Sequence, residues 1–311
     1  MRFHYRAFEQ GGHHLHEMVD DESGFRMIVD SLGAELVSVA QRQGDGDHWR
    51  GYLYRDGLVA APAQGWKNHA TVMGYFVHRL KNEQTDYEGD IIRGGNHGFL
   101  RHKTFSTSEV LIQDRGTLSF RLSSTEIEPT EYPRKVSFGI DFALLGNEVE
   151  VVFGFRNEAA DRPAHVSFGL HPGFAVTSVE QARVILPRGS YRRHLAPGNF
   201  LSGEVRDFES DGRHFPFKAF ELPDTFLIEP LETEENVVRL RDLVDGHEVE
   251  IDLSDAPYFA LWSDLNPYVC VEPCWGLPDH QAQEPFTQKL GIQVIPAGGT
   301  LTRRCAFRFN G

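Results

Sequence analysis

The chain has 311 residues, of which 40% are hydrophobic, and its formal net charge at pH 7 is −14. Its basic residues are scattered along the sequence, and this argues against the concentrated basic face that nucleic-acid binding requires. No stretch of about 18 apolar residues could cross a membrane as a helix. The polar residues that follow Arg6 predict no signal peptide. An odd, low number of cysteines favours reduced thiols, so we expect a cytoplasmic protein.

The first third of the chain shows few regular patterns. Residues 1–25 include three histidines at positions 13–16, and we interpret this segment as a solvated loop rather than a metal site. Two short strands are predicted within residues 25–40, and an aromatic-rich strand within residues 49–56. Residues 66–105 are irregular and interrupted by glycines, which is typical of binding loops held by a rigid scaffold.

Strand patterns are dense in the rest of the chain. Apolar and polar residues alternate over 118–122, 136–144 and 149–155, and Gly146-Asn147 between the last two runs predicts a β-hairpin. No segment has an apolar face at helical spacing. The sequence therefore predicts an all-β fold, a large antiparallel sandwich or barrel, with residues 1–311 as a single domain. Further strands are predicted at residues 165–171, 184–186, 226–229, 237–240, 249–253, 259–262, 268–272 and 304–309.

His171 is the first candidate for chemistry. It follows a run in which apolar and polar residues alternate, and its neighbours on the same face, Ser167 and Gly169, are very small. Pro172-Gly173 predicts the end of the strand, which would place His171 above a cavity. A histidine can exchange a proton near neutral pH, since its unperturbed pKa is about 6.5. The structural alternative is a histidine hydrogen-bonded to the backbone.

Further candidates have polar side chains in apolar surroundings. Glu272 lies near the end of a predicted strand, where burial would raise its pKa and a cation would lower it; a solvent-facing glutamate is the alternative. Arg79 has apolar flanks and could contact a ligand or form a structural salt bridge. His97 lies in an aromatic and basic cluster. Trp262 and Trp275 could pack against a sugar ring, although plain core residues are favoured.

Several other chemistries lack their motifs. The chain has no phosphate-binding loop, no nucleophile elbow and no HExxH zinc motif. Cys270 and Cys274 lack the spacing and the sequence partners of a zinc site, and we interpret them as small buried hydrophobic residues. We therefore expect no metal site. A histidine and a glutamate without nucleophile or metal suit proton transfer.

Taken in order, these residues resemble the aldose 1-epimerase (galactose mutarotase) family, in the form of its shorter, divergent bacterial branch. Two stretches depart from the family pattern. Residues 74–78 stand where the family has a proline-rich run, and residues 66–69 match no pattern. The segments that carry the resemblance are 32–38, 79–80, 97–101, 132–133, 171–174, 223–226 and 269–273.

The resemblance implies a β-sandwich of the galactose mutarotase (supersandwich) type that interconverts the α and β anomers of an aldose without a cofactor. It implies that Glu272 and His171 are catalytic, exchanging protons with the C1 hydroxyl and the ring oxygen. Arg79, His97 and Asp224 would bind the sugar hydroxyls. The partner would be a small sugar, and the sequence leaves open which sugar, whether it is phosphorylated, and whether the chain forms a homodimer.

Two other classes of function remain open. The first is a carbohydrate-binding or regulatory protein that keeps the cleft without catalysis. The second is a lyase or hydrolase on a related sandwich. A hydrolase would need a second carboxylate about 5–9.5 Å from that of Glu272.

Overall fold

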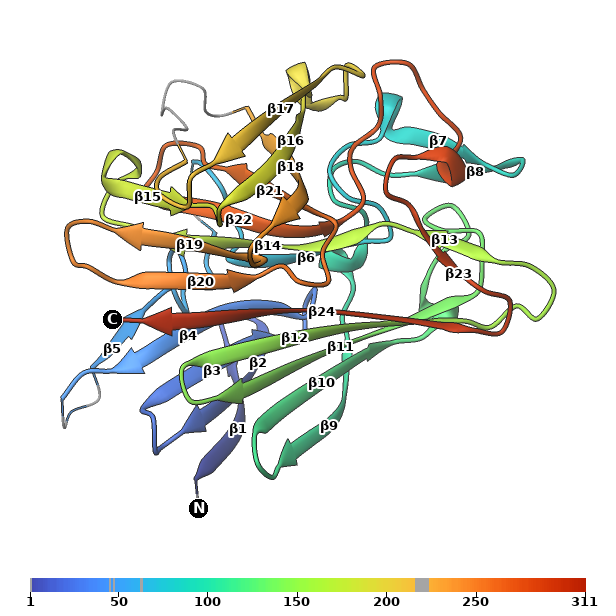
Figure 1. Cartoon of the computed structure of the whole chain (residues 1–311). Coiled ribbons are helices and arrows are strands. Elements are labelled where there is room, and N and C mark those ends of the chain that lie inside the picture. Colours follow the sequence, from blue (N-terminus) through green and yellow to red (C-terminus); the bar gives the residue numbers. More distant parts are fainter. Residues whose placement is uncertain (1, 45, 47, 62–63, 216–223) are drawn as a thin grey trace.

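Antiparallel β-strands make up nearly all the regular structure of the chain (Figure 1). The computed structural model describes residues 2–44, 46, 48–61, 64–215 and 224–311. The helices in these residues are single 3-10 turns, and none has the length and apolar character needed to span a membrane. They are η1 (Lys81–Glu83), η2 (Leu100–His102), η3 (Ser124–Glu126), η4 (Val179–Gln181), η5 (Pro197–Asn199) and η7 (Phe286–Gln288).

The N-terminal strands form a five-stranded sheet in sequence order, so the prediction of a solvated loop over residues 1–25 is wrong. His16 is buried here, with one ring nitrogen 2.9 Å from the Tyr5 hydroxyl and the other 3.0 Å from that of Ser31. Because a histidine occupies this core position, the alternation of apolar and polar residues that would predict a strand is not apparent in the sequence. The strands are β1 (Phe3–Gln10), β2 (His13–Asp20), β3 (Phe25–Asp30), β4 (Glu35–Arg42) and β5 (Trp49–Gly51).

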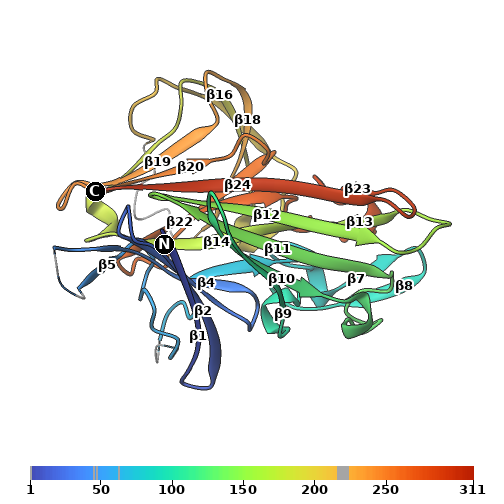
Figure 2. The ribbon, with the colours of Figure 1, turned by 90° about the horizontal axis from the view of Figure 1, so that it is seen from below.

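An eight-stranded antiparallel sheet forms one main layer, and β24, β12 and β11 run side by side through it (Figure 2). The predicted hairpin is confirmed, because Leu145 pairs with Glu148 across a two-residue turn. In sheet order the strands are β15 (Ala182–Ile185), β19 (Val237–Asp242), β20 (Glu248–Asp252), β24 (Thr300–Asn310), β12 (Glu148–Asn157), β11 (Val136–Leu145), β10 (Gly116–Leu122) and β9 (Ser106–Ile112).

A seven-stranded sheet forms the opposing layer. Two small two-stranded sheets accompany it: β7 (Gln84–Tyr87) with β8 (Asp90–Arg93), and β13 (Ala164–Val166) with β23 (Gln293–Ile295). In sheet order the seven strands are β17 (Val205–Ser210), β16 (Gly189–His194), β18 (Phe226–Thr233), β21 (Tyr258–Trp262), β22 (Tyr268–Trp275), β14 (Phe168–Ala175) and β6 (Ala70–Met73).

Aromatic side chains join the two main layers. Phe153 of β12 lies 5.4 Å from Phe168 of β14 and 5.3 Å from Trp275 of β22, measured between ring centroids. Phe168 and Trp275 stack on each other at 5.0 Å. The largest buried apolar cluster contains these rings and extends from Phe3 to Phe309. The predicted antiparallel β-sandwich is confirmed, and the Trp275 side chain is a core residue as expected.

Candidate active site

His171 and Glu272 lie within two neighbouring strands, β14 and β22, and not at strand ends as predicted. Both strands continue through the proline that follows, Pro172 in one and Pro273 in the other. Proline has no backbone N–H to donate, so it fits a strand only where no ladder hydrogen bond is needed. A Pro-Gly pair usually marks a turn, and Pro172-Gly173 therefore predicted that the strand ends at His171.

The backbone pairing between β14 and β22 opens at this point. The three residues on each strand between the flanking pairs are not paired with each other, and both prolines fall in this gap. The register of the flanking pairs places His171 directly opposite Glu272. These pairs are Gly169 with Cys274 and Gly173 with Cys270.

The side chains of His171 and Glu272 form a buried acid–base pair. His171 Nε2 lies 3.3 Å from Glu272 Oε1, whereas His171 Nδ1 and Glu272 Oε2 have no partner among the described residues. Burial disfavours charge on both groups. It raises the pKa of Glu272 to about 8 and lowers the pKa of His171 to about 3. At neutral pH the pair is therefore uncharged overall and holds one proton, on the carboxyl group.

A cavity of about 310 Å³ opens at this pair and brings together four of the five predicted site residues: His171, Glu272, Arg79 and His97. Asp224 is exposed and does not line the cavity, although the next residue, Thr225, does. Pro223, which begins the predicted aspartate segment, lies outside the described residues. Other residues outside the set of five also line the cavity, among them Trp66, Asn68, His78, Asn96, Arg101 and Trp262.

Arg79 and His97 flank the small sheet of β7 and β8, which interrupts the segment that was predicted to be irregular. The backbone of Arg79 bridges to that of Asn96, and the His97 N–H donates a hydrogen bond of 2.7 Å to the carbonyl of His78. Within the described part of the chain, the exposed Arg79 guanidinium has neither a hydrogen bond nor an ion pair, so the salt-bridge alternative gains no support. His97 is buried, its Nδ1 lacks a described partner, and burial lowers its pKa well below the usual value.

Trp66 forms one wall of the cavity, and the sequence analysis did not identify it. Its ring stacks on that of His171, with centroids 5.0 Å apart and planes 25° apart. A side chain at position 173 would prevent this stack, because a Cβ on Gly173 would lie 2.2 Å from Trp66 Cζ3. Trp262 also contacts the His171 ring, edge to face at 5.7 Å, and its ring lies 6.4 Å from that of Trp66. Because Trp262 lines the cavity, its interpretation as a plain core residue is wrong. In the sequence, the signal that a large ring packs over His171 was Gly173, the glycine two residues further along the same strand.

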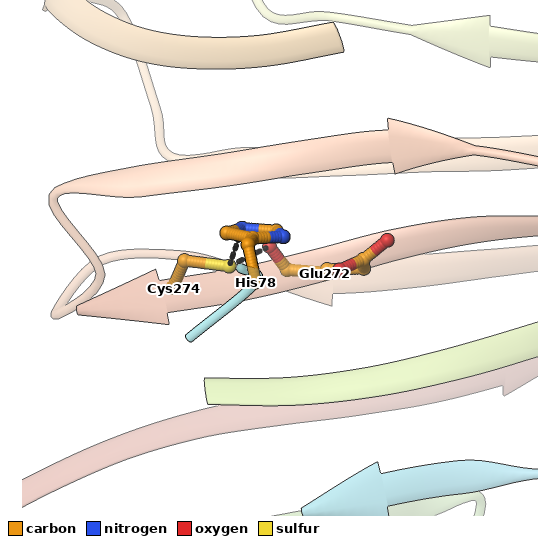
Figure 3. A group of neighbouring side chains, drawn as sticks. All are labelled: His78, Glu272 and Cys274. Atoms are coloured by element: carbon orange, nitrogen blue, oxygen red, sulfur yellow. Dashed lines mark hydrogen bonds between the residues drawn. The ribbon is translucent and has the colours of Figure 1, made fainter. Parts of the chain in front are cut away.

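His78 also reaches the acid–base pair, from the stretch that departs from the family pattern (Figure 3). Its Nε2 lies 3.8 Å from Cys274 Sγ, and the Cys274 thiol donates to the carbonyl of Glu272 at 3.3 Å. Burial lowers the pKa of His78 to about 4. Cys270 and Cys274 are fully buried, as expected, but Cys274 has partners that the sequence did not indicate.

The fold and this arrangement place the chain among known proteins. The family model described as aldose 1-epimerase matches residues 18–308, so the chain belongs to the aldose 1-epimerase family. A search of the curated proteins finds no significant match.

Solved structures agree with this fold. The galactose mutarotase related enzyme from Lactobacillus acidophilus is 22% identical, with 99% of this chain and 98% of that chain covered and a TM-score of 0.79. A galactose mutarotase-like protein from Lactobacillus casei is 20% identical, with 99% and 100% covered and a TM-score of 0.79. A galactose mutarotase-like protein from Clostridium acetobutylicum is 13% identical, with 100% and 99% covered and a TM-score of 0.72. At these identities the likeness establishes the fold.

Proposed function

We propose that the chain is an aldose 1-epimerase that interconverts the α and β anomers of a sugar, with Glu272 and His171 as the catalytic pair. The observation that carries the proposal is the geometry of this pair. One carboxyl and one imidazole face each other at 3.3 Å and open into a cavity. The raised pKa of Glu272 and the lowered pKa of His171 leave the pair with one exchangeable proton at neutral pH. Anomer exchange needs one group that gives a proton while another takes one, and in the reverse step each group must do the opposite.

The chemistry follows from this proton count. A proton passes from Glu272 to His171, leaving a carboxylate beside an imidazolium. The carboxylate takes the proton of the C1 hydroxyl while His171 protonates the ring oxygen, so the C1–O5 bond breaks and the open-chain aldehyde forms. Rotation about C1–C2 presents the other face of the aldehyde. The two groups then return their protons in the opposite sense, and each positioned group contributes about 10²–10⁴-fold.

The other lining residues have binding roles in this proposal. Arg79 has no ion pair among the described residues and lines the cavity, so it is suited to charge-assisted hydrogen bonds with sugar hydroxyls. The His97 ring is neutral, and its Nδ1, which lacks a described partner, can form an ordinary hydrogen bond with a hydroxyl. The aromatic faces of Trp66 and Trp262 suit the apolar face of a sugar ring. We retain Asp224 as a sugar ligand only on the family resemblance, since its side chain lies outside the described cavity lining.

A hydrolase has less support than an epimerase. Glu272 is the one carboxylate among the described residues that line the cavity, whereas glycoside hydrolysis normally uses two. We further propose that residues 1–311 act as one domain, because the largest buried cluster runs from Phe3 to Phe309.

Polarimetry on freshly dissolved α-glucose and α-galactose tests the proposed function, with protein-free solution as the reference. We expect the protein to accelerate the approach to the anomeric equilibrium of at least one aldose without changing its position. Saturation-transfer NMR against free and phosphorylated sugars identifies the responsive substrate. A sugar that binds at this site without any acceleration would replace the epimerase with the carbohydrate-binding alternative.

A further inference from the structure

Three metal-ligating side chains of different chemistry meet beside the proposed catalytic carboxylate. They are the imidazole of His78, the carboxyl of Glu272 and the thiol of Cys274, and one ligand atom from each lies within 4.8 Å of the other two (Figure 3). Glu272 and Cys274 are two residues apart on β22 and therefore project from the same face of the strand. His78 comes from a loop and lies over both.

The spacing of these donors suits a tetrahedral ion. Typical zinc distances are about 2.3 Å to sulfur and 2.0–2.1 Å to nitrogen, and a tetrahedral ion then holds the two ligands about 3.6 Å apart. His78 Nε2 and Cys274 Sγ are 3.8 Å apart without an ion. This pair is therefore close to the ligand geometry already. The Glu272 oxygen lies within 4.8 Å of both atoms and would have to move toward them. The cavity that His78 and Glu272 line would supply the fourth position.

Two further observations point to a ligand here. Glu272 is 1% exposed, and its Oε2 has no hydrogen-bond partner among the described residues. His78 has a φ of +53°, a left-handed conformation that a histidine seldom adopts and that is enriched at functional sites. This backbone brings its ring to Cys274 and to the cavity.

We propose that His78 Nε2, the Glu272 carboxylate and the Cys274 thiolate bind a Zn²⁺ ion, and that the bound ion reversibly blocks the reaction. The inhibition rests on the proposed function, in which Glu272 exchanges the proton; the binding does not. An imidazole, a thiolate and a carboxylate together favour zinc over the hard cations Mg²⁺ and Ca²⁺.

Binding at this site is a proton exchange. Zn²⁺ displaces the thiol proton of Cys274 and the carboxyl proton of Glu272, and both protons go to solvent, while His78 is already neutral. Because the ion displaces these two protons, zinc affinity should rise with pH as long as both groups are protonated in the metal-free protein. A coordinated Glu272 cannot accept the C1 hydroxyl proton. Chelators should therefore leave the proposed activity intact, and added zinc should remove it.

Co²⁺ is a suitable probe, because its charge-transfer absorption requires a thiolate ligand and does not arise at sites made of histidines alone. Co²⁺ titrated into the reduced, metal-free protein should produce a thiolate-to-cobalt charge-transfer band that saturates at one ion per chain and is removed by Zn²⁺. Cys274→Ser should abolish this band, and His78→Gln should weaken cobalt binding at least tenfold. Cys270→Ser is the matched control, since it changes a thiol of equal burial on the same strand and should keep the band.

Zinc-loaded wild-type protein gives a second measurement that needs no variant to fold. X-ray absorption should show one sulfur ligand at about 2.3 Å. Absence of the band from wild type, or a band that survives Cys274→Ser, would overturn the proposal. The ligand atoms of His171, Cys270 and Glu272 also lie within 4.8 Å of one another. Loss of the band in Cys270→Ser alone would therefore overturn the proposal and assign the ion to that second group. If no sugar responds to the protein, the cobalt band still tests the site, so the two proposals can fail separately.

Discussion

The strands β12 and β22 belong to opposing layers of one sandwich and treat their carboxylates in opposite ways. Along β12, half-exposed and buried residues alternate over most of its length, and Glu148 and Glu150 pair with arginines at 2.8 and 2.7 Å. Along β22 every residue is buried, and Glu272 faces a neutral histidine, while its second carboxyl oxygen has no partner in the part of the chain that the structure describes. A carboxyl group without a cation in a buried strand is destabilising, and its presence there supports the proposed catalytic role of Glu272.

The largest expected effect is on turnover, and it should separate the buried Glu272 of β22 from the ion-paired glutamates of β12. Glu272→Gln keeps the shape of the side chain but cannot exchange a proton, so turnover should fall by about 10²–10⁴-fold. His171→Asn should behave likewise, and the double variant should be little worse than the poorer single one because the two groups act as one unit. Initial mutarotation rates on one responsive sugar measure this.

Glu150→Gln is the matched control on β12, and its rate should equal that of wild type. A Glu272→Gln variant with a near-normal rate would contradict the assignment of Glu272, and Asp224 would then be the first carboxylate to examine.

The same Glu272→Gln substitution should stabilise the protein. The folded-state pKa of Glu272, about 8, lies above its ordinary value of 4.5, so the folded state binds more protons between these pH values and wild-type stability falls as pH rises through that window. Gln cannot ionise, so its advantage should grow from about pH 5 and reach up to about 3 kcal/mol at pH 7. Urea unfolding at several pH values measures the free energy. Glu150→Gln should show no such pH-dependent gain, and equal pH dependence in wild type and Glu272→Gln would refute the raised pKa.

The pH profile of kcat/KM should show the shared proton. The pair holds one proton between the lowered pKa of His171, about 3, and the raised pKa of Glu272, about 8. The rate should therefore be flat from about pH 5 to 7 and fall about tenfold per unit above pH 8, where the pair loses its proton. The decline at high pH, and the corresponding decline at low pH, would report apparent pKa values of the pair rather than of either residue alone. The protein-free rate must be subtracted at each pH. A decline that begins near pH 6.5 would indicate ordinary, unshifted groups.

The contrast between the strands also explains how far the sequence could predict the molecule. The period-2 pattern and the two-residue turn beside β12 are local signals, and they predicted the hairpin and the sandwich. Four candidate residues, including His171 and Glu272, meet in one cavity as the family resemblance implied. Their catalytic and binding roles remain predictions.

Long-range packing accounts for what the sequence analysis missed. Trp66 reaches His171 only because β14 carries Gly173 beneath it, and His78 and Cys274 are 196 positions apart. The two prolines seemed to end strands that in fact continue, because a gap in backbone pairing cannot be seen from one strand. Asp224 followed from the family motif alone, and it does not line the cavity.

Arg79→Lys should weaken substrate binding without affecting stability. Lysine keeps the charge but lacks the planar pair of donors, so KM should rise about tenfold. Arg79 has no ion pair among the described residues, so the melting temperature should not change. Arg134→Lys is the opposite control, since the Arg134 guanidinium is buried against Glu88 and Asp90 and should affect melting but not KM. Lower melting with normal kinetics in Arg79→Lys would restore the structural interpretation.

The smallest expected effects are those of replacing one glycine in each layer by alanine, measured as KM and as stability. A Cβ at Gly173 of β14 would overlap the Trp66 ring, so Gly173→Ala should displace that ring from His171 and raise KM several-fold. A Cβ at Gly154 of β12 would lie 3.8 Å from its nearest neighbour, and Gly154→Ala should be neutral or stabilise the protein by about 0.4–1 kcal/mol. Substrate titrations and melting curves of the two variants test the contrast. If the effect at position 173 acts through the indole, Gly173→Ala should add nothing in a Trp66→Ala background. An equal rise in KM with and without Trp66 would show that the added methyl group disturbs the strand itself.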